Sequence, residues 1–171
     1  MKTIFVLRHA KTEKLGFKNI SNDFDRPLMP FGIDQCQKIC DYLKKSTQKI
    51  DLVIASPALR TKQTAELSIA GLAHIPKIEF IPHLYNAKSD TILKTIEKLD
   101  DSISTIIVVG HNPGIHEFAI KISSAGESEL IRNIVEDYSP GTMARVEFPD
   151  LLTWNKLKNT NGKLLDLLVT K

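Results

Sequence analysis

The sequence is poor in the features that mark membrane, nucleic-acid-binding and metal-binding proteins. No apolar run approaches the roughly 20 residues that a membrane helix requires. The formal net charge is only +3, from 23 basic and 20 acidic residues, which does not indicate the concentrated basic face that nucleic acid binding usually needs. Only two of the 171 residues are cysteine, and no second pair is present to complete a metal site.

Signs of subdivision or export are also missing. The chain has no repeat, no low-complexity tract and no linker rich in Pro, Gly or Ser. Because 42% of the residues are hydrophobic, there is enough apolar material for one core, and we expect a single domain over residues 1–171. Residues 1–3 lead into an apolar run too short for a signal-peptide core, which predicts a cytoplasmic protein. Cys36 and Cys40 are expected to be buried thiols on one face of a helix.

What the chain does contain is an alternation of strand-like and helix-like stretches. Thr105 to Val109 is continuous and β-branched, as expected of a central parallel strand covered on both faces. The alternation predicts an α/β fold, a three-layer α/β/α sandwich in which helices cover both faces of a mostly parallel sheet. Further strands are expected at Ile4 to Leu7, Asp51 to Ala55, Lys77 to Ile81, Thr142 to Phe148 and Leu164 to Val169.

Helix signals lie between these strands. Pro30 opens an amphipathic stretch that reaches Leu43, and Asp90 to Leu99 places its apolar residues on one helical face. Ser56 followed by Pro57 predicts a helix start, with Ser56 as the N-cap. Pro113 can begin a further helix that reaches Ile122, whereas residues 124–138 have no assigned role.

Basic side chains follow three of the expected strands at the point where each strand ends. His9 follows the first strand, Arg60 lies just after the second, and His111 follows Thr105 to Val109. If these strands are neighbours, the three side chains meet in the crevice where open α/β sheets bind ligands. Arginine matches phosphate oxygens, and a neutral histidine can attack phosphorus. The pattern therefore indicates phosphoryl chemistry.

Several motifs, in this order along the chain, together resemble those of the histidine phosphatase superfamily. The resemblance is to its phosphoglycerate mutase-like fold and its branch of small, SixA-type phosphohistidine phosphatases. The motifs that carry it are Leu7-Arg8-His9, Asp25-Arg26-Pro27-Leu28, Ser56-Pro57 with Arg60 and Thr64-Ala65-Glu66, Gly110-His111-Asn112-Pro113, and Trp154.

The resemblance implies a role for each matching residue. His9 would be the nucleophile that becomes phosphorylated, Arg8 and Arg60 would hold the phosphoryl oxygens, and His111 would stabilise the transferring group. Arg26 would be a further substrate-binding residue, although a loop arginine beside a proline is equally compatible with a structural ion pair. No metal or other cofactor is implied, because positioning and charge neutralisation supply most of the catalysis.

The sequence departs from the family in two places. Ala10 stands where glycine is common after the Arg-His pair, and no carboxylate appears in the loop after the third strand until Asp90. An alkoxide leaving group needs a general acid, worth about 10²- to 10⁴-fold, whereas imidazole has a conjugate acid pKa of about 6.5 and can leave after protonation by water. The missing acid favours phosphohistidine as substrate, with His83 and Asp90 as weak candidates for the acid.

Other functions remain compatible with the sequence. A phosphatase of the same fold could act on a small phosphate ester, and a phosphate-binding module could lack turnover altogether. A metal or redox protein built on the cysteines and histidines is a third hypothesis, disfavoured because His111 and His116 lie five residues apart, on different helical faces. The short chain leaves little material for a cap over the crevice, which favours a phosphohistidine displayed on a partner protein.

Overall fold

The protein is built around one seven-stranded sheet. Its structure is a computed structural model that describes residues 1–46 and 48–171. The strand order is β3-β2-β4-β1-β6-β7-β5, and β6 runs antiparallel to both of its neighbours while the other pairs are parallel. The mostly parallel sheet predicted from the alternation is thus confirmed. The strands are β1 (Lys2–Arg8), β2 (Leu52–Ala55), β3 (Lys77–Phe80), β4 (Thr105–Gly110), β5 (Ser123–Gly126), β6 (Thr142–Phe148) and β7 (Gly162–Val169).

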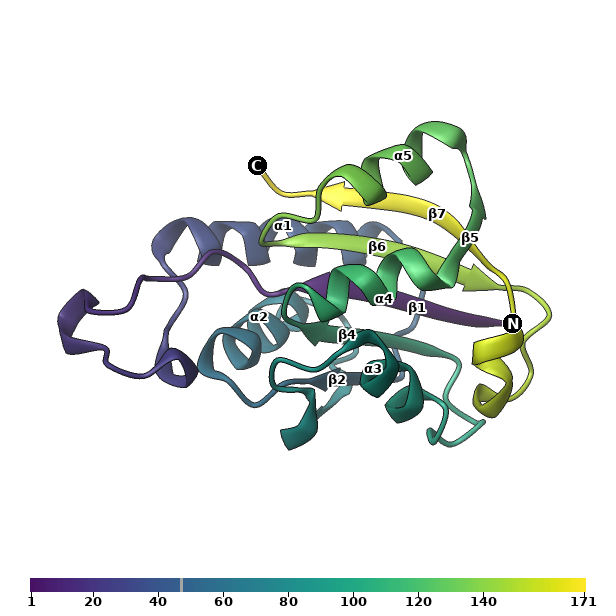
Figure 1. Ribbon diagram of the computed structural model, residues 1–171, viewed down its shortest axis with the longest axis horizontal. Coiled ribbons are helices and arrows are strands. Elements are labelled where there is room, and N and C mark those ends of the chain that lie inside the picture. Colours follow the sequence, from purple (N-terminus) through teal and green to yellow (C-terminus); the bar gives the residue numbers. More distant parts are fainter. Residues whose placement is uncertain (47) are drawn as a thin grey trace.

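Helices cover both faces of this sheet, which confirms the three-layer sandwich (Figure 1). On one face, Ile39 and Ile69 pack with Phe5 and Val53; on the other, Phe118 packs with Ile4. The first face is covered by α1 (Pro30–Lys45) and α2 (Leu59–Ile69), and the second by α3 (Ser89–Ile96), α4 (Gly114–Ile122) and α5 (Ser128–Glu136).

The two central strands explain why the sheet is stable and where the site lies. Ile4 to Leu7 of β1 are completely buried, and every residue of β4 is buried, because helices cover both faces of these strands. In register, Leu7 lies opposite Val109, which also lies opposite Ala55 of β2. The carboxyl ends of β1, β4 and β2 are therefore neighbours, as the sequence-based site hypothesis requires.

The predicted helix start at Ser56 is wrong. The helix begins at Leu59, with Ala58 as its N-cap, and Thr61 and Lys62 donate their backbone N–H groups to the Ala58 carbonyl. The Ser56 hydroxyl still accepts from the Ala58 N–H at 3.4 Å and also lies 2.7 Å from the His111 ring, but the backbone of Ala58 is extended (φ −60°, ψ 147°), so helical geometry starts only at Leu59. Arg60 still lies in the first turn of α2, as predicted.

Other boundaries differ in smaller ways. The helix expected over Asp90 to Leu99 spans Ser89–Ile96, and the third strand ends at Phe80, one residue early. The segment without a predicted role forms β5 and α5, the latter packed on the sheet through Ile134. Within the described residues, no helix is both long and apolar enough to cross a bilayer.

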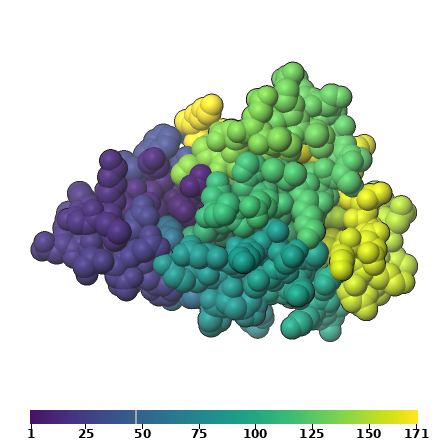
Figure 2. Space-filling model, in the orientation of Figure 1, coloured from purple at the N-terminus to yellow at the C-terminus, as the bar shows by residue number. Residues whose placement is uncertain are grey.

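The segment after β1 forms one end of the molecule. It is the purple region in the space-filling view, where the yellow segment just after β6 lies at the opposite end (Figure 2). Two short 3₁₀ turns, Phe17–Asn19 and Asp23–Asp25, give this segment local structure before α1 begins. The segment thus lies beside the carboxyl ends of the central strands, and its residues Lys11, Thr12, Lys14 and Arg26 line the pocket described below.

Candidate active site

A polar pocket opens at the carboxyl ends of β1 and β4. Its volume is about 350 Å³, and every side chain of the predicted site lines it. The structure therefore brings His9, Arg8, Arg60, His111 and Arg26 together, although they come from four separate parts of the chain. Also in the lining are Lys11, Thr12, Lys14, Asn86, Asn112 and Pro140.

His9 is held in the orientation that a nucleophile needs. It directly follows β1, and its backbone N–H donates to the Gly110 carbonyl of β4. Its Nδ1 lies 2.9 Å from the Ala10 carbonyl oxygen, which can only accept, so Nδ1 carries the proton. Nε2 of the neutral ring then keeps its lone pair. The ring is 9% exposed, so that an incoming group can still reach it.

The residue that follows His9 is fixed by neighbouring elements. The Ala10 backbone N–H donates to Thr64 Oγ1 of α2 at 3.0 Å, and the Lys11 N–H donates to Gln35 Oε1 of α1 at 2.8 Å. The Ala10 methyl group packs with Leu28 and Cys36 in a small apolar cluster. Alanine in place of the family's usual glycine thus adds an anchor for this loop.

Arg8 is the last residue of β1, and its guanidinium group reaches across to the end of α5. Arg8 Nη1 donates to the Tyr138 carbonyl at 2.9 Å, while the tyrosine hydroxyl donates to the Val6 carbonyl at 2.6 Å. Tyr138 therefore ties both its backbone and its ring to β1. Burial lowers the pKa of Arg8, and Asp137 opposes this effect. The unassigned segment of the sequence thus turns out to position a predicted phosphate ligand.

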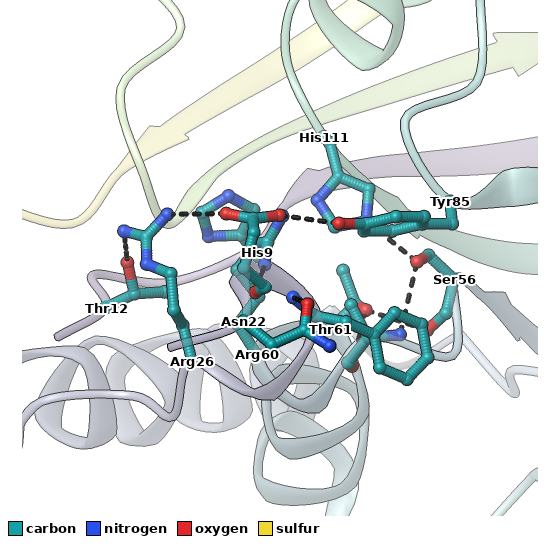
Figure 3. A network of polar contacts seen from close by, with 12 residues as sticks. His9, Thr12, Asn22, Arg26, Ser56, Arg60, Thr61, Tyr85 and His111 are labelled. Atoms are coloured by element: carbon teal, nitrogen blue, oxygen red, sulfur yellow. Dashed lines mark hydrogen bonds and ion pairs between the residues drawn. The ribbon is translucent and has the colours of Figure 1, made fainter. Parts of the chain in front are cut away.

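Arg60 and Arg26 are oriented by one carboxylate. Arg60 Nη1 and Nη2 donate to the Asp23 carbonyl and to Asp23 Oδ2 at 2.7 and 3.0 Å, and Arg26 Nη1 donates to Asp23 Oδ1 at 3.0 Å. The Tyr85 hydroxyl donates a hydrogen bond to Asp23 Oδ2 at 2.6 Å. Figure 3 shows Tyr85 within this network. The Tyr85 hydroxyl and the two arginines keep the pKa of Asp23 well below its usual range, so it stays ionised.

The sequence left two roles open for Arg26, a structural ion pair and substrate binding, and the structure is compatible with both. Besides its ion pair with Asp23, its Nε donates to the Glu13 carbonyl at 2.8 Å and its Nη2 to Thr12 Oγ1 at 2.6 Å. It nevertheless lines the same pocket as His9. The structural ion pair therefore fixes a guanidinium group at the pocket wall.

His111 sits across the pocket from His9. The two rings lie 5.4 Å apart, and Tyr85 packs edge-on against His111 at 5.5 Å. His111 Nε2 is 2.7 Å from the hydroxyl of the fully buried Ser56 (Figure 3). Its Nδ1 is buried and has no partner among the described residues. If Ser56 donates to Nε2, the proton of the neutral ring lies on Nδ1, where it is available to an acceptor.

Electrostatics keep both histidines neutral near pH 7. Burial lowers the pKa of His9 to about 3, and the charges of Arg60 and Arg8 reinforce the shift while the Ala10 carbonyl opposes it. Burial likewise lowers the pKa of His111 to about 3, with Arg60 as the next cause. A neutral imidazole among several fixed cations has the chemistry that a nucleophile beside a bound anion would need.

Neither weak candidate for a general acid lies in this pocket. His83 Nε2 contacts Thr95 Oγ1 at 2.9 Å, and Asp90 is an exposed residue paired with Lys121 at 2.6 Å. Asp23, the carboxylate in contact with the site arginines, is poorly suited to the role because it stays ionised. No side chain of the pocket lining is a carboxylic acid, within the described part of the chain.

The structure offers little to a metal or redox site. Cys36 and Cys40 are buried free thiols, as predicted, and burial raises the pKa of Cys36 to about 11. His116 directs its Nε2 to the Ile134 carbonyl at 2.6 Å. Among residues 1–46 and 48–171, no three His, Cys, Asp or Glu side chains are grouped as a metal site would require.

Several residues that orient the side chains of the site were not predicted as functional residues from the sequence. Asp23 and Tyr85 orient the arginines, Ser56 contacts His111, and Asn112 Nδ2 donates to the Tyr138 carbonyl at 3.1 Å. Asp23 lies three residues before Arg26, but a polar loop with several acidic residues gives no reason to select it. The Ser56 signal was present and was interpreted as a helix cap.

Comparison with known proteins places the chain in a family. Residues 4–88 match the model of the histidine phosphatase superfamily, branch 1. Protein ML1117 of Mycobacterium leprae, itself uncharacterised, is 30% identical over 121 residues, which are 70% of this chain and 73% of that protein. Phosphohistidine phosphatase SixA of Escherichia coli is 25% identical over 113 residues, 64% of this chain and 67% of SixA.

The fold similarity extends over nearly the whole chain. The protein histidine phosphatase SixA, solved in complex with tungstate, superposes with a TM-score of 0.76 at 19% identity and covers 98% of this chain and 97% of its own. At that identity the similarity concerns the fold, and it agrees with the SixA-type architecture expected from the motifs. From the family model, the M. leprae relative and the shared fold, we conclude that this chain belongs to the histidine phosphatase superfamily.

Proposed function

We propose that the protein is a phosphohistidine phosphatase that dephosphorylates a partner protein through a phosphorylated His9. In the first step His9 Nε2 attacks phosphorus, the P–N bond of the substrate breaks, and the departing imidazole takes a proton from water. In the second step water attacks the same phosphorus, the bond to Nε2 breaks, and inorganic phosphate leaves.

The observation that carries this proposal is the free Nε2 of a neutral His9 inside a ring of fixed cations. Nδ1 is committed to the Ala10 carbonyl, so the lone pair on Nε2 is the one available to phosphorus. Arg8, Arg26 and Arg60 line the same pocket and would neutralise the charge of the phosphoryl oxygens. The Nε atoms of Arg8 and Arg60 have no acceptor among the described residues, which fits an oxyanion ligand.

His111 fits the second role in the transfer. Its buried Nδ1 lacks an acceptor among the residues described, and its ring lies 5.4 Å from that of His9. As a hydrogen-bond donor, it would stabilise an equatorial oxygen as the phosphoryl group moves to His9. These residues supply the charge neutralisation themselves, so the proposed mechanism needs no metal ion, and we expect a chelator to leave turnover unchanged.

The leaving group decides between phosphohistidine and a phosphate ester. No carboxylic acid lines the described pocket, and the pKa of Asp23 lies well below its usual range, so a proton donor for an alkoxide is missing there. General acid help is worth about 10²- to 10⁴-fold, whereas imidazole leaves readily once protonated by water. This argument supports a phosphoramidate substrate, and the name of the E. coli relative agrees with it.

The test is phosphate release from a histidine-phosphorylated protein and from 4-nitrophenyl phosphate. We expect the wild type to prefer the phosphohistidine protein and His9→Ala to release no phosphate from either substrate. Asp90→Asn, an exposed variant outside the pocket, is the matched control and should retain wild-type turnover. A labelled phosphoryl group should be found on His9 after brief incubation. Faster turnover of the ester would favour the small-molecule phosphatase, and activity of His9→Ala would refute the covalent mechanism.

A further inference from the structure

A second cavity adjoins the phosphoryl pocket and is not used by the proposed chemistry. It has a volume of about 290 Å³ and shares two lining residues, Lys11 and Pro140, with the pocket that holds His9. We refer to it as the Phe31 groove, lined by Lys11, Phe31, Gln35, Ser139, Pro140, Thr170 and Lys171. Because the two cavities share these residues they are neighbours, and a substrate protein whose phosphoryl group faces His9 would have further atoms within reach of this groove.

The floor of the groove is preformed by one buried side chain. Gln35, which is 3% exposed, uses Nε2 to donate to the carbonyls of Pro140 and Thr170 at 2.8 and 2.7 Å, and its Oε1 accepts from the Lys11 N–H at 2.8 Å. Gly141 packs against it with φ of +78°, where a Cβ would overlap Gln35 and Thr170. Three separate chain segments are thus joined below the groove, so that binding there requires little ordering of the protein.

One wall of the groove is an aromatic ring that the fold leaves half-uncovered. Phe31 lies in the first turn of α1 and is 42% exposed, whereas the core-facing residues of that helix are buried. Two positions further along, Ile33 is 48% exposed and lines a different cavity, between α1 and α2. Both residues are apolar and exposed to a similar degree, but only Phe31 lines the cavity that shares residues with the pocket of His9.

We propose that the Phe31 groove binds an apolar side chain of the substrate protein, one that lies close to the phosphohistidine. This inference rests on the proposed function for the identity of the phosphorylated residue. The choice of occupant rests on the two lining residues shared with the pocket of His9 and on the half-exposed Phe31 ring, whose burial by an apolar side chain would be favourable. The volume is at the low end of small-molecule sites and suits one side chain. Lys11 and Lys171 on its sides disfavour a basic residue there.

The test uses a pair of short peptides that have no charged group other than the phosphoryl group and that differ at one flanking position. Both carry phosphohistidine, flanked by leucine in one peptide and by glycine in the other. Turnover is measured for wild type, Phe31→Ala and the matched control Ile33→Ala, with phosphoramidate as a substrate too small to reach the groove. Binding is measured separately by calorimetry, with the same peptides carrying a non-hydrolysable phosphoryl-triazolylalanine.

We expect the wild type and Ile33→Ala to prefer the leucine peptide by about tenfold in kcat/KM and in affinity, and Phe31→Ala to lose that preference. All three proteins should hydrolyse phosphoramidate at the same rate. The groove proposal is refuted if wild type does not discriminate between the peptides, or if Phe31→Ala keeps the preference. If no phosphoramidate is hydrolysed but the analogues bind with the expected preference, the proposed function fails and the groove assignment stands.

Discussion

Acidification to pH 5 should destabilise the folded protein through the two site histidines. The folded state holds His9 and His111 neutral, with pKa values of about 3, whereas the ordinary histidine value is 6.5. Between these two values, unfolding takes up protons, so the free energy of unfolding decreases as the pH falls. The contribution is complete above about pH 7 and is lost progressively as the pH falls from 6.5 towards 3.

The expected size follows from the same values. At pH 5 the pH is about 1.5 units below the pKa of a histidine in the unfolded chain, which favours protonation of that histidine by about 2 kcal/mol. The rings in the folded protein stay neutral at this pH. The two histidines together should therefore lower the free energy of unfolding by about 4 kcal/mol between pH 7 and pH 5, a large part of the 5–15 kcal/mol typical of a domain. Asp23 contributes in a different window, because its stabilisation is lost only below the ordinary carboxyl pKa of 3.8.

The assay is urea unfolding followed by the fluorescence of Trp154, the single tryptophan of the chain, which is completely buried. Unfolding free energies at pH 7 and pH 5 are compared between wild type and the double variant His9→Asn/His111→Asn. The other three histidines are present in both proteins, so their effects cancel. Wild type should lose about 4 kcal/mol more than the variant; an equal loss in both would refute the claim that the folded state keeps these rings neutral.

Two further variants test how the site is supported. Ser56→Ala should lower kcat for a phosphohistidine substrate by about tenfold with little change in KM, because His111 loses its hydrogen-bond partner. The control is Ser68→Ala, at a buried serine of α2 outside the pocket. Equal rates in both variants would exclude a role for Ser56. Tyr138→Phe should lower the free energy of unfolding by about 1–3 kcal/mol in urea titrations, since the Val6 carbonyl and the Ala144 N–H both lose a buried partner; an unchanged midpoint would contradict this.

Much of the fold is predictable because the sheet is buried on both faces. The middle of a strand covered on two sides is apolar at every position, and Ile4 to Leu7 and Ile106 to Val109 show this directly in the sequence. The short edge strand β5 has the sequence Ser123–Gly126, with no apolar run at all, and is defined by its pairing with β7. That pairing is a tertiary contact, which no local pattern reports.

The site was predictable where function places unusual residues directly after a strand, and not where it depends on distant contacts. His9 and His111 follow buried strands, so their convergence could be inferred from topology alone. Ser56 was misassigned because a serine before proline has the local pattern of a helix cap, and its actual partner lies 55 residues away. Asp23 and Tyr85 could not be selected, because their hydrogen bond joins two polar loops 62 residues apart.

The link between Arg8 and the Tyr138 carbonyl also bears on how the site assembles. It joins residues 130 positions apart in a chain of 171 residues. Contacts of this sequence separation form only after a large loss of chain entropy, so they accompany closure of the sheet rather than formation of local helices. A fragment that ends after β4 would contain Arg8, His9, Arg26 and Arg60 but would lack the Tyr138 carbonyl that accepts from Arg8. The proposed phosphate release would therefore report complete folding, which secondary-structure signals alone do not provide.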